Sequence, residues 1–193
     1  MSAPGLEVED REFRVRAQQP VDYTLRIVDG VLDPANDVLA KAYRSWDRCL
    51  AVVDENLDRL YGERLRGYFA HHGIELTVFS IRIAEQDKTM RTAERIVDAF
   101  TEFGLLRKEP VLVIGGGLTT DVAGFACSMF RRATNYVRIP TSLIGLIDAS
   151  VAIKVAVNHG GGKNRLGAFH ASQQVLLDFS FLQTLPRIGR AHV

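Results

Sequence analysis

The segment Val111–Asp121, Val-Leu-Val-Ile-Gly-Gly-Gly-Leu-Thr-Thr-Asp, decides the fold class of this chain. Its first four residues are a short apolar run, as expected of a strand that is buried on both faces of a parallel sheet. Three glycines follow, and a helix-like stretch continues from them to about Phe130. Because glycines allow positive φ and close backbone approach, and a helix N-terminus presents free N–H groups, this turn can bind a phosphate. The spacing is not G-x-G-x-x-G, so a tight turn without a ligand remains an alternative.

Strand and helix patterns alternate on both sides of this segment. This order predicts an α/β fold, with a Rossmann-like, mainly parallel sheet flanked by helices and joined by right-handed crossovers. Residues 1–20 are polar and are predicted to form a loose arm, so the domain itself covers residues 21–186. We predict strands at 23–28, 49–53, 74–83 and 136–139, helices at about 54–72 and 89–103, and a helical stretch from Pro34 to Tyr43.

Length and composition exclude several classes of protein. The 193 residues are enough for one domain with a real core, and 47% apolar with 24% charged residues is typical of globular proteins rather than disordered or fibrous ones. A net charge of +1 gives no reason to expect a nucleic-acid partner. We see no membrane span and no signal peptide, and we read Cys49 and Cys127 as buried free thiols in a reducing compartment. These features predict a cytoplasmic protein.

Two carboxylates follow predicted strands at positions where nucleotides commonly bind. Asp54 could accept hydrogen bonds from an adenosine ribose, or it could cap the helix that follows. Asp121 could contact a ligand, or it could serve as a carboxylate that satisfies the helix dipole. Neither residue decides the function alone.

The densest chemical signal lies between Pro140 and Phe169. Asp148 and Lys154 interrupt an apolar stretch there, and burying a charge without a partner is costly, so we expect each to meet a partner or a ligand. A pocket for an anion could be formed by Lys154, Lys163, Asn164 and Arg131, although Lys163 could also be an ordinary solvated loop charge. None of the five histidines forms an H-x-x-x-H pair, so we assign no metal ligand.

These short motifs, in this order, resemble the N-terminal domain of the sugar phosphate cyclases, the superfamily of 3-dehydroquinate synthase. Each motif is weak alone, but their joint order is specific. The matching elements are Asp54-Glu55-Asn56, Glu85–Lys88, Gly115–Phe125, Arg131, Pro140–Leu143, Asp148–Val151, Lys154, Lys163–Phe169 and Thr184–Pro186.

One stretch indicates a branch of this superfamily. Dehydroquinate synthases typically read D-S-S-V-G-G-K-T where this chain reads Asp-Ala-Ser-Val-Ala-Ile-Lys-Val at 148–155. With Arg165 and His170, this looks like the branch that cyclises sedoheptulose 7-phosphate. The resemblance implies NAD-dependent conversion of that sugar phosphate to 2-epi-5-epi-valiolone with elimination of phosphate, by a homodimeric enzyme of secondary metabolism. The alternatives are a 3-dehydroquinate or desmethyl-4-deoxygadusol synthase, a polyol dehydrogenase, and a non-catalytic nucleotide-binding fragment.

The resemblance also implies site residues by position. Asp148, Lys154 and Asn164 would be catalytic, and Lys154 and Asn164 would hold the phosphate with Arg131 of a partner subunit. A divalent metal, Zn or Co, would be bound by residues beyond Val193, and residues 187–193 would begin the link to that helical domain. The residues implied for NAD are Asp54, Asn56, Glu85, Lys88, Gly116, Gly117, Asp121, Thr141, Ser142, Lys163, Phe181, Thr184 and Leu185.

Overall fold

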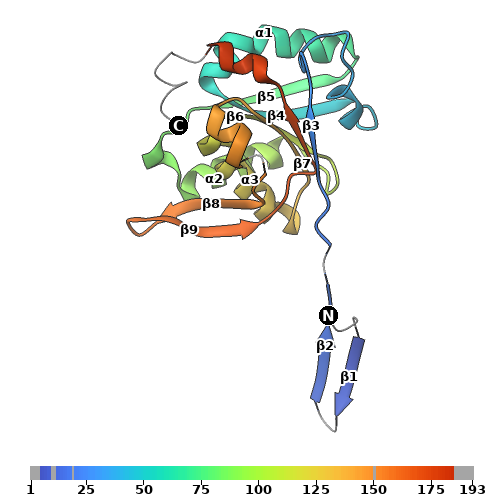
Figure 1. The fold of residues 1–193 in the computed structure, drawn as a ribbon, viewed down its shortest axis with the longest axis vertical. Helices are drawn as coiled ribbons and strands as arrows, with labels where there is room; N and C mark the ends of the chain where they lie inside the picture. Colours follow the sequence, from blue (N-terminus) through green and yellow to red (C-terminus); the bar gives the residue numbers. More distant parts are fainter. Residues whose placement is uncertain (1–4, 10–11, 19, 150, 185–193) are drawn as a thin grey trace.

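The centre of the protein is a six-stranded sheet in which every neighbouring pair of strands is parallel. The computed structural model describes residues 5–9, 12–18, 20–149 and 151–184, and Figure 1 shows their arrangement. The strand order β3-β10-β7-β6-β4-β5 confirms the predicted α/β class. The strands are β3 (Thr24–Ile27), β4 (Arg48–Asp54), β5 (Glu75–Ile81), β6 (Val111–Gly115), β7 (Tyr136–Pro140) and β10 (Gln174–Leu177).

Helices cover both faces of the sheet. Helix α1 (Glu55–His71) packs on one face, whereas α2 (Met90–Glu102) and α3 (Gly117–Met129) pack on the other (Figure 1). Side chains of a strand alternate between the two faces, so Ala51 and Val53 join the core under α1 while Leu50 and Val52 join the core under α2 and α3. This two-sided burial explains why β4 and β6 are continuous apolar runs. In the described part of the chain, no helix has both the length and the apolar character that crossing a membrane requires.

The prediction of a helical stretch from Pro34 to Tyr43 is wrong. This segment forms turns and a short 3₁₀ helix at Ala40–Ala42. The carboxylate of Asp33 accepts the N–H of Ala35 at 2.9 Å, and the amide oxygen of Asn36 accepts the N–H of Val38 at 3.0 Å. Such side-chain bonds compete with helical ones. The helical spacing of the apolar residues instead reflects core packing, since Leu39, Ala40 and Tyr43 are fully buried.

A hairpin, β8 (Lys154–His159) with β9 (Gly162–Phe169), interrupts the strand–helix alternation that the sequence predicted throughout. It packs against α3 through Val155 and Val157, in the same core cluster as Tyr136 of β7. The approach is close: a Cβ built on Gly124 of α3 would lie 2.6 Å from Cγ1 of Val155. Helix α3 therefore packs closely against both the sheet and this hairpin.

The N-terminal arm, expected to be loose, contains a second hairpin. Strand β1 (Gly5–Glu9) pairs antiparallel with β2 (Glu12–Arg16), and Figure 1 shows the pair apart from the sheet. At the other end, residues 187–193, predicted to begin a link to a further domain, lie outside the described residues. Cys49 and Cys127 are buried and free, as predicted.

Candidate functional site

The candidate site lies at the carboxyl ends of β4, β6 and β7, where ligands bind in open α/β sheets. Strand β6 runs through Gly115, and α3 begins two residues later with Gly116 as its N-cap. No side chain caps this helix, so its first N–H groups are available to a ligand. The glycines serve space rather than positive φ: a Cβ on Gly115 would lie 2.6 Å from Cβ of Thr119. The turn thus presents bare backbone to the adjoining cavity.

A cavity of about 440 Å³ opens beside this turn and collects much of the set of residues predicted to bind NAD. Asp54 combines both roles that the sequence left open. Its Oδ1 accepts the N–H of Asn56 at 3.0 Å as a helix cap, and the carboxylate still lines the cavity. Leu185 lies outside the described residues. The cavity is lined by Asp54, Asn56, Leu57, Arg59, Leu60, Gly116, Thr141, Ser142, Phe181 and Thr184.

The far wall of this cavity is fixed by α1. The ring of Tyr61 contacts that of Phe181 edge-on at 4.9 Å between centroids, and its hydroxyl donates to Oγ1 of Thr184 at 3.3 Å. Three lining residues, Leu57, Arg59 and Leu60, were not predicted from the sequence. The feature that could have identified them is their position in the first turns of the helix that follows Asp54.

Two further cavities, of about 580 and 250 Å³, lie on the hairpin side of α3. Asp121 and Lys154 line both of them, and the three residues predicted to be catalytic lie around this pair: Asp148 lines the larger cavity and Asn164 the smaller. The fold therefore gathers residues from α3, from the segment before β8 and from β9 at one place.

Asp148 and Lys154 are exposed, so neither is a buried charge that requires a protein partner, and the expectation that each meets a ligand stays a prediction. The surrounding apolar stretch is itself at the surface, with Ile147 64% and Val151 52% exposed. Within the described residues, neither charged side chain makes a hydrogen bond or ion pair. Both charges thus face the open cavities.

Lys88 is the buried cation of the site. It is 6% exposed, and its Nζ donates to Oδ2 of Asp121 at 2.7 Å and to Oδ1 of Asn164 at 2.6 Å. A buried charge is tolerated when it is paired and hydrogen-bonded in this way. Lys88 therefore connects the helix that starts at the glycine turn to the hairpin.

Lys163 does not join Lys154 in one anion pocket. Its exposed Nζ lies 3.3 Å from Oε1 of Glu85, in the 3₁₀ segment Glu85–Asp87. Asn158 donates to the same oxygen at 3.0 Å, and this bond, followed by the ion pair, lowers the pKa of Glu85. Arg131 is exposed, with its guanidinium 5.6 Å from the Phe130 ring, and is not among the residues that line these cavities. Its contribution to a partner subunit stays a prediction.

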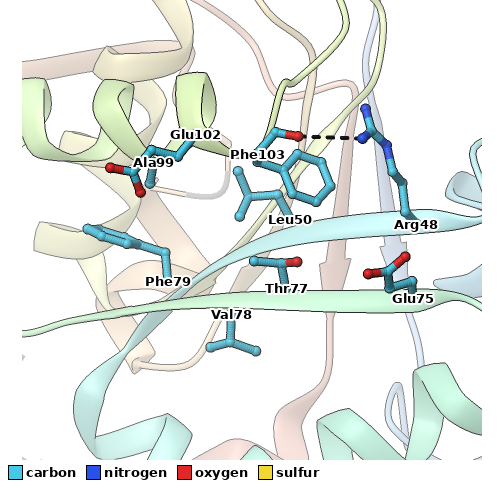
Figure 2. Close-up of a pocket in the computed structure, with 9 residues that line it drawn as sticks. All are labelled: Arg48, Leu50, Glu75, Thr77, Val78, Phe79, Ala99, Glu102 and Phe103. Atoms are coloured by element: carbon cyan, nitrogen blue, oxygen red, sulfur yellow. Dashed lines mark hydrogen bonds between the residues drawn. The ribbon is translucent and has the colours of Figure 1, made fainter.

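A cavity of about 460 Å³ at the opposite end of the sheet is a poorer candidate (Figure 2). It lies at the amino ends of β4 and β5. Arg48 donates to the carbonyl oxygen of Phe103 at 3.4 Å and pairs with the buried Glu109 at 2.8 Å. The guanidinium of Arg48 is thus already engaged in structural contacts.

A model of a known protein family matches the part of the chain that carries most of the candidate site. The model of the 3-dehydroquinate synthase N-terminal domain matches residues 78–191, which include the glycine turn and the hairpin. This chain belongs to the 3-dehydroquinate synthase family. It spans about half the length of the curated relatives it matches.

The relatives of this family member are sugar phosphate cyclases. The chain is 58% identical over 180 residues to demethyl-4-deoxygadusol synthase of Trichormus variabilis, which covers 93% of this chain and 44% of that protein. A solved 2-epi-5-epi-valiolone synthase from Streptomyces hygroscopicus subsp. jinggangensis, with NAD⁺ and Zn²⁺ bound, superposes with a TM-score of 0.84 at 44% identity, over 89% of this chain and 47% of that one. A butanol dehydrogenase of Thermotoga maritima, at 14% identity and a TM-score of 0.68 over 91% of this chain and 47% of that one, shares the fold alone.

The residues of the candidate site fit NAD, the dinucleotide bound in the solved 2-epi-5-epi-valiolone synthase. The uncapped start of α3 suits a pyrophosphate, and the carboxylate of Asp54 at the end of β4 suits a ribose hydroxyl. For a metal, no group of three or more potential ligands exists among the described residues, so we derive no chemistry from a metal on this chain.

Proposed function

We propose that the intact protein carrying this chain is an NAD-dependent sugar phosphate cyclase, and that this chain forms its dinucleotide-binding half with part of the substrate pocket. One observation carries the proposal: the uncapped start of α3 lies between the cavity containing Asp54 and the cavities containing Asp148, Lys154 and Asn164. A dinucleotide on one side and a phosphorylated sugar on the other would thus lie next to each other at the N-terminus of α3.

On the dinucleotide side, the N–H groups that follow Gly116 would donate to the pyrophosphate. Asp54 would accept from a ribose hydroxyl, and Phe181 with Thr184 would bound the far end of the cavity. When bound, NAD supplies a hydride acceptor that later returns the hydride, so the overall reaction needs no net redox change.

On the sugar side, Lys154 and Asn164 would bind the phosphoryl group. They line one cavity, and the exposed ammonium of Lys154 can approach an anion without leaving an established ion pair. Hydrogen bonds between charged donors and phosphate are stronger than neutral ones. Asp148, across the larger cavity from Glu85, would accept a hydrogen bond from a sugar hydroxyl.

We propose sedoheptulose 7-phosphate as the substrate. Both 2-epi-5-epi-valiolone synthases and demethyl-4-deoxygadusol synthases are expected to act on this sugar phosphate. The stretch 148–155 favours this substrate over that of dehydroquinate synthase, and the resemblance of the sequence motifs implies 2-epi-5-epi-valiolone as the product. The 58% identity to a demethyl-4-deoxygadusol synthase, against 43–46% for several 2-epi-5-epi-valiolone synthases, favours demethyl-4-deoxygadusol. Both products therefore stay candidates, as do the homodimer and the cytoplasmic location.

The test uses the intact protein with NAD and a divalent metal. We expect inorganic phosphate to be released from sedoheptulose 7-phosphate without accumulation of NADH, and mass spectrometry of the product to identify which cyclitol forms. The heptulosonate phosphate that 3-dehydroquinate synthase uses is tested in parallel, and turnover of that compound alone would contradict the proposed substrate while leaving a cyclase. Binding of NAD without any turnover would instead support the alternative of a non-catalytic nucleotide-binding protein.

A further inference from the structure

Asn158 lies where the β8–β9 hairpin becomes irregular. Val157 pairs with Leu166, but the next pair is His159 with Gly162, so β9 has the three residues Lys163–Arg165 where β8 has only Asn158. Bulges of this kind re-aim side chains and are frequent beside binding sites. Asn164, in the middle of the three residues, has φ of 52°, in the left-handed region, which asparagine adopts more readily than other non-glycine residues. The contacts around Asn164 select this conformation over the extended one.

Asn158 supplies such a contact and connects it to a second segment. Its Oδ1 accepts the backbone N–H of Asn164 at 2.8 Å. Its Nδ2 donates to Oε1 of Glu85 at 3.0 Å, and its own backbone N–H donates to the carbonyl oxygen of Lys88 at 2.7 Å. One half-buried side chain thus joins β9 to the segment 85–88, both of which carry residues of the candidate site.

The orientation of the Asn164 amide follows from its contact with Lys88. An ammonium group can only donate, so the atom of Asn164 that lies 2.6 Å from Nζ of Lys88 is the amide oxygen. The NH₂ group on the other branch of the amide is consequently turned away from Lys88. Asn164 lines a cavity with Lys154, and within the described residues its NH₂ group makes no hydrogen bond, so its two N–H donors are available to a ligand.

We propose that Asn158 is a positioning residue of the phosphoryl-binding site. It holds the backbone of Asn164 in the left-handed conformation from which the Asn164 amide donates to phosphoryl oxygens beside Lys154. The lower pKa of Glu85 agrees with this geometry, since the hydrogen bond from Asn158 is its first cause. The inference rests on the proposed function, because it takes the ligand to be the phosphoryl group of a sugar phosphate.

The test is a double-mutant cycle in the intact protein with NAD present. Affinity for inorganic phosphate, measured by calorimetry, and KM for sedoheptulose 7-phosphate are compared in Asn158→Ala, Asn164→Ala and the double variant. We expect each single variant to weaken phosphate binding by about tenfold, the effect of losing one hydrogen bond to a charged group. Since Asn158 acts through Asn164, the double variant should lose little more than Asn164→Ala alone. Additive losses would mean that Asn158 has an independent, merely structural effect, and would overturn the proposal.

Two further variants control for folding. His159→Ala changes the neighbouring exposed residue of the same hairpin and should keep wild-type phosphate affinity. Should Asn158→Ala not fold, Asn158→Gln keeps the amide group but moves it by one methylene, so the same loss is expected. Wild-type phosphate affinity in folded Asn158→Gln would refute the positioning role.

The cycle also separates this inference from the cyclase proposal. A wild-type protein that binds inorganic phosphate but turns over no sugar phosphate would contradict the proposed function, while the phosphate affinities would still measure the coupling between Asn158 and Asn164. A protein that turns over the substrate, and in which Asn164→Ala weakens phosphate binding but Asn158→Ala changes neither phosphate affinity nor KM, would contradict the positioning role alone.

Discussion

Replacing Lys88 with methionine tests how much the buried ion pair of Lys88 and Asp121 contributes to the free energy of unfolding. Methionine nearly matches the length of lysine, so the main change is loss of the ammonium that contacts Asp121 and Asn164. Removing one partner of a fully buried pair costs about 3–5 kcal/mol, because the other charge is left uncompensated. Here the lysine side chain is 7% exposed and that of Asp121 is 26% exposed, so water can reach the carboxylate. We therefore expect the lower end, about 3 kcal/mol of unfolding free energy.

Lys163→Met is the matched control. It is the same substitution in the same site, but the Lys163 side chain is 76% exposed and its partner Glu85 is 50% exposed. Exposed pairs contribute little, so this variant should unfold almost as the wild type does. Urea denaturation of the intact protein and both variants, with NAD absent, gives the comparison. Equal losses in the two variants, or no loss in Lys88→Met, would refute the burial argument.

Three other predictions follow from the same structure. Lys154→Met should abolish phosphate release from the sugar phosphate while NAD affinity, measured by calorimetry, remains; unchanged turnover would exclude its phosphate role. Gly124→Ala should destabilise the protein by up to about 2 kcal/mol in thermal melts, because overpacking against the hairpin costs about 1–3 kcal/mol and the gain in helix propensity is about 1 kcal/mol. Gly67→Ala is the control: a Cβ there meets nothing within 4 Å, so this variant should be more stable than the wild type in the same melts. Burial raises the pKa of the Cys49 and Cys127 thiols, so both should react slowly with a thiol reagent in native protein and quickly in urea, and fast native labelling would show that the core is open.

The central layers could be predicted from sequence because their signal is local. Strands β4 and β6 are buried on both faces and therefore read as unbroken apolar runs. The β8–β9 hairpin was missed because it buries few apolar side chains, such as Val155 and Val157, and packs on a helix rather than joining the sheet. Strand β10, only four residues long, is placed by its pairing with β3 and β7, which no local pattern reveals.

The site shows the same division. The glycine turn and Asp54 were recognisable because each lies at the carboxyl end of an apolar strand. The roles of Lys88 and Asn158 were not, since they depend on contacts between segments 76 and 73 residues apart in the sequence. For Asn158 the deciding feature is the register shift of the hairpin, which spacing in one strand cannot show.

The two sides of the site are built on supports of different stiffness. The dinucleotide side stands on interior strands of a six-stranded sheet, whereas Lys154 and Asn164 stand on a two-stranded ribbon at the surface, whose last residue, Phe169, is 78% exposed. Substitutions at the exposed positions of the ribbon can therefore change the sugar side of the site without altering the strands that carry the dinucleotide side. Such an arrangement lets descendants of one ancestral protein diverge in the sugar they accept while inheriting the same way of holding the coenzyme.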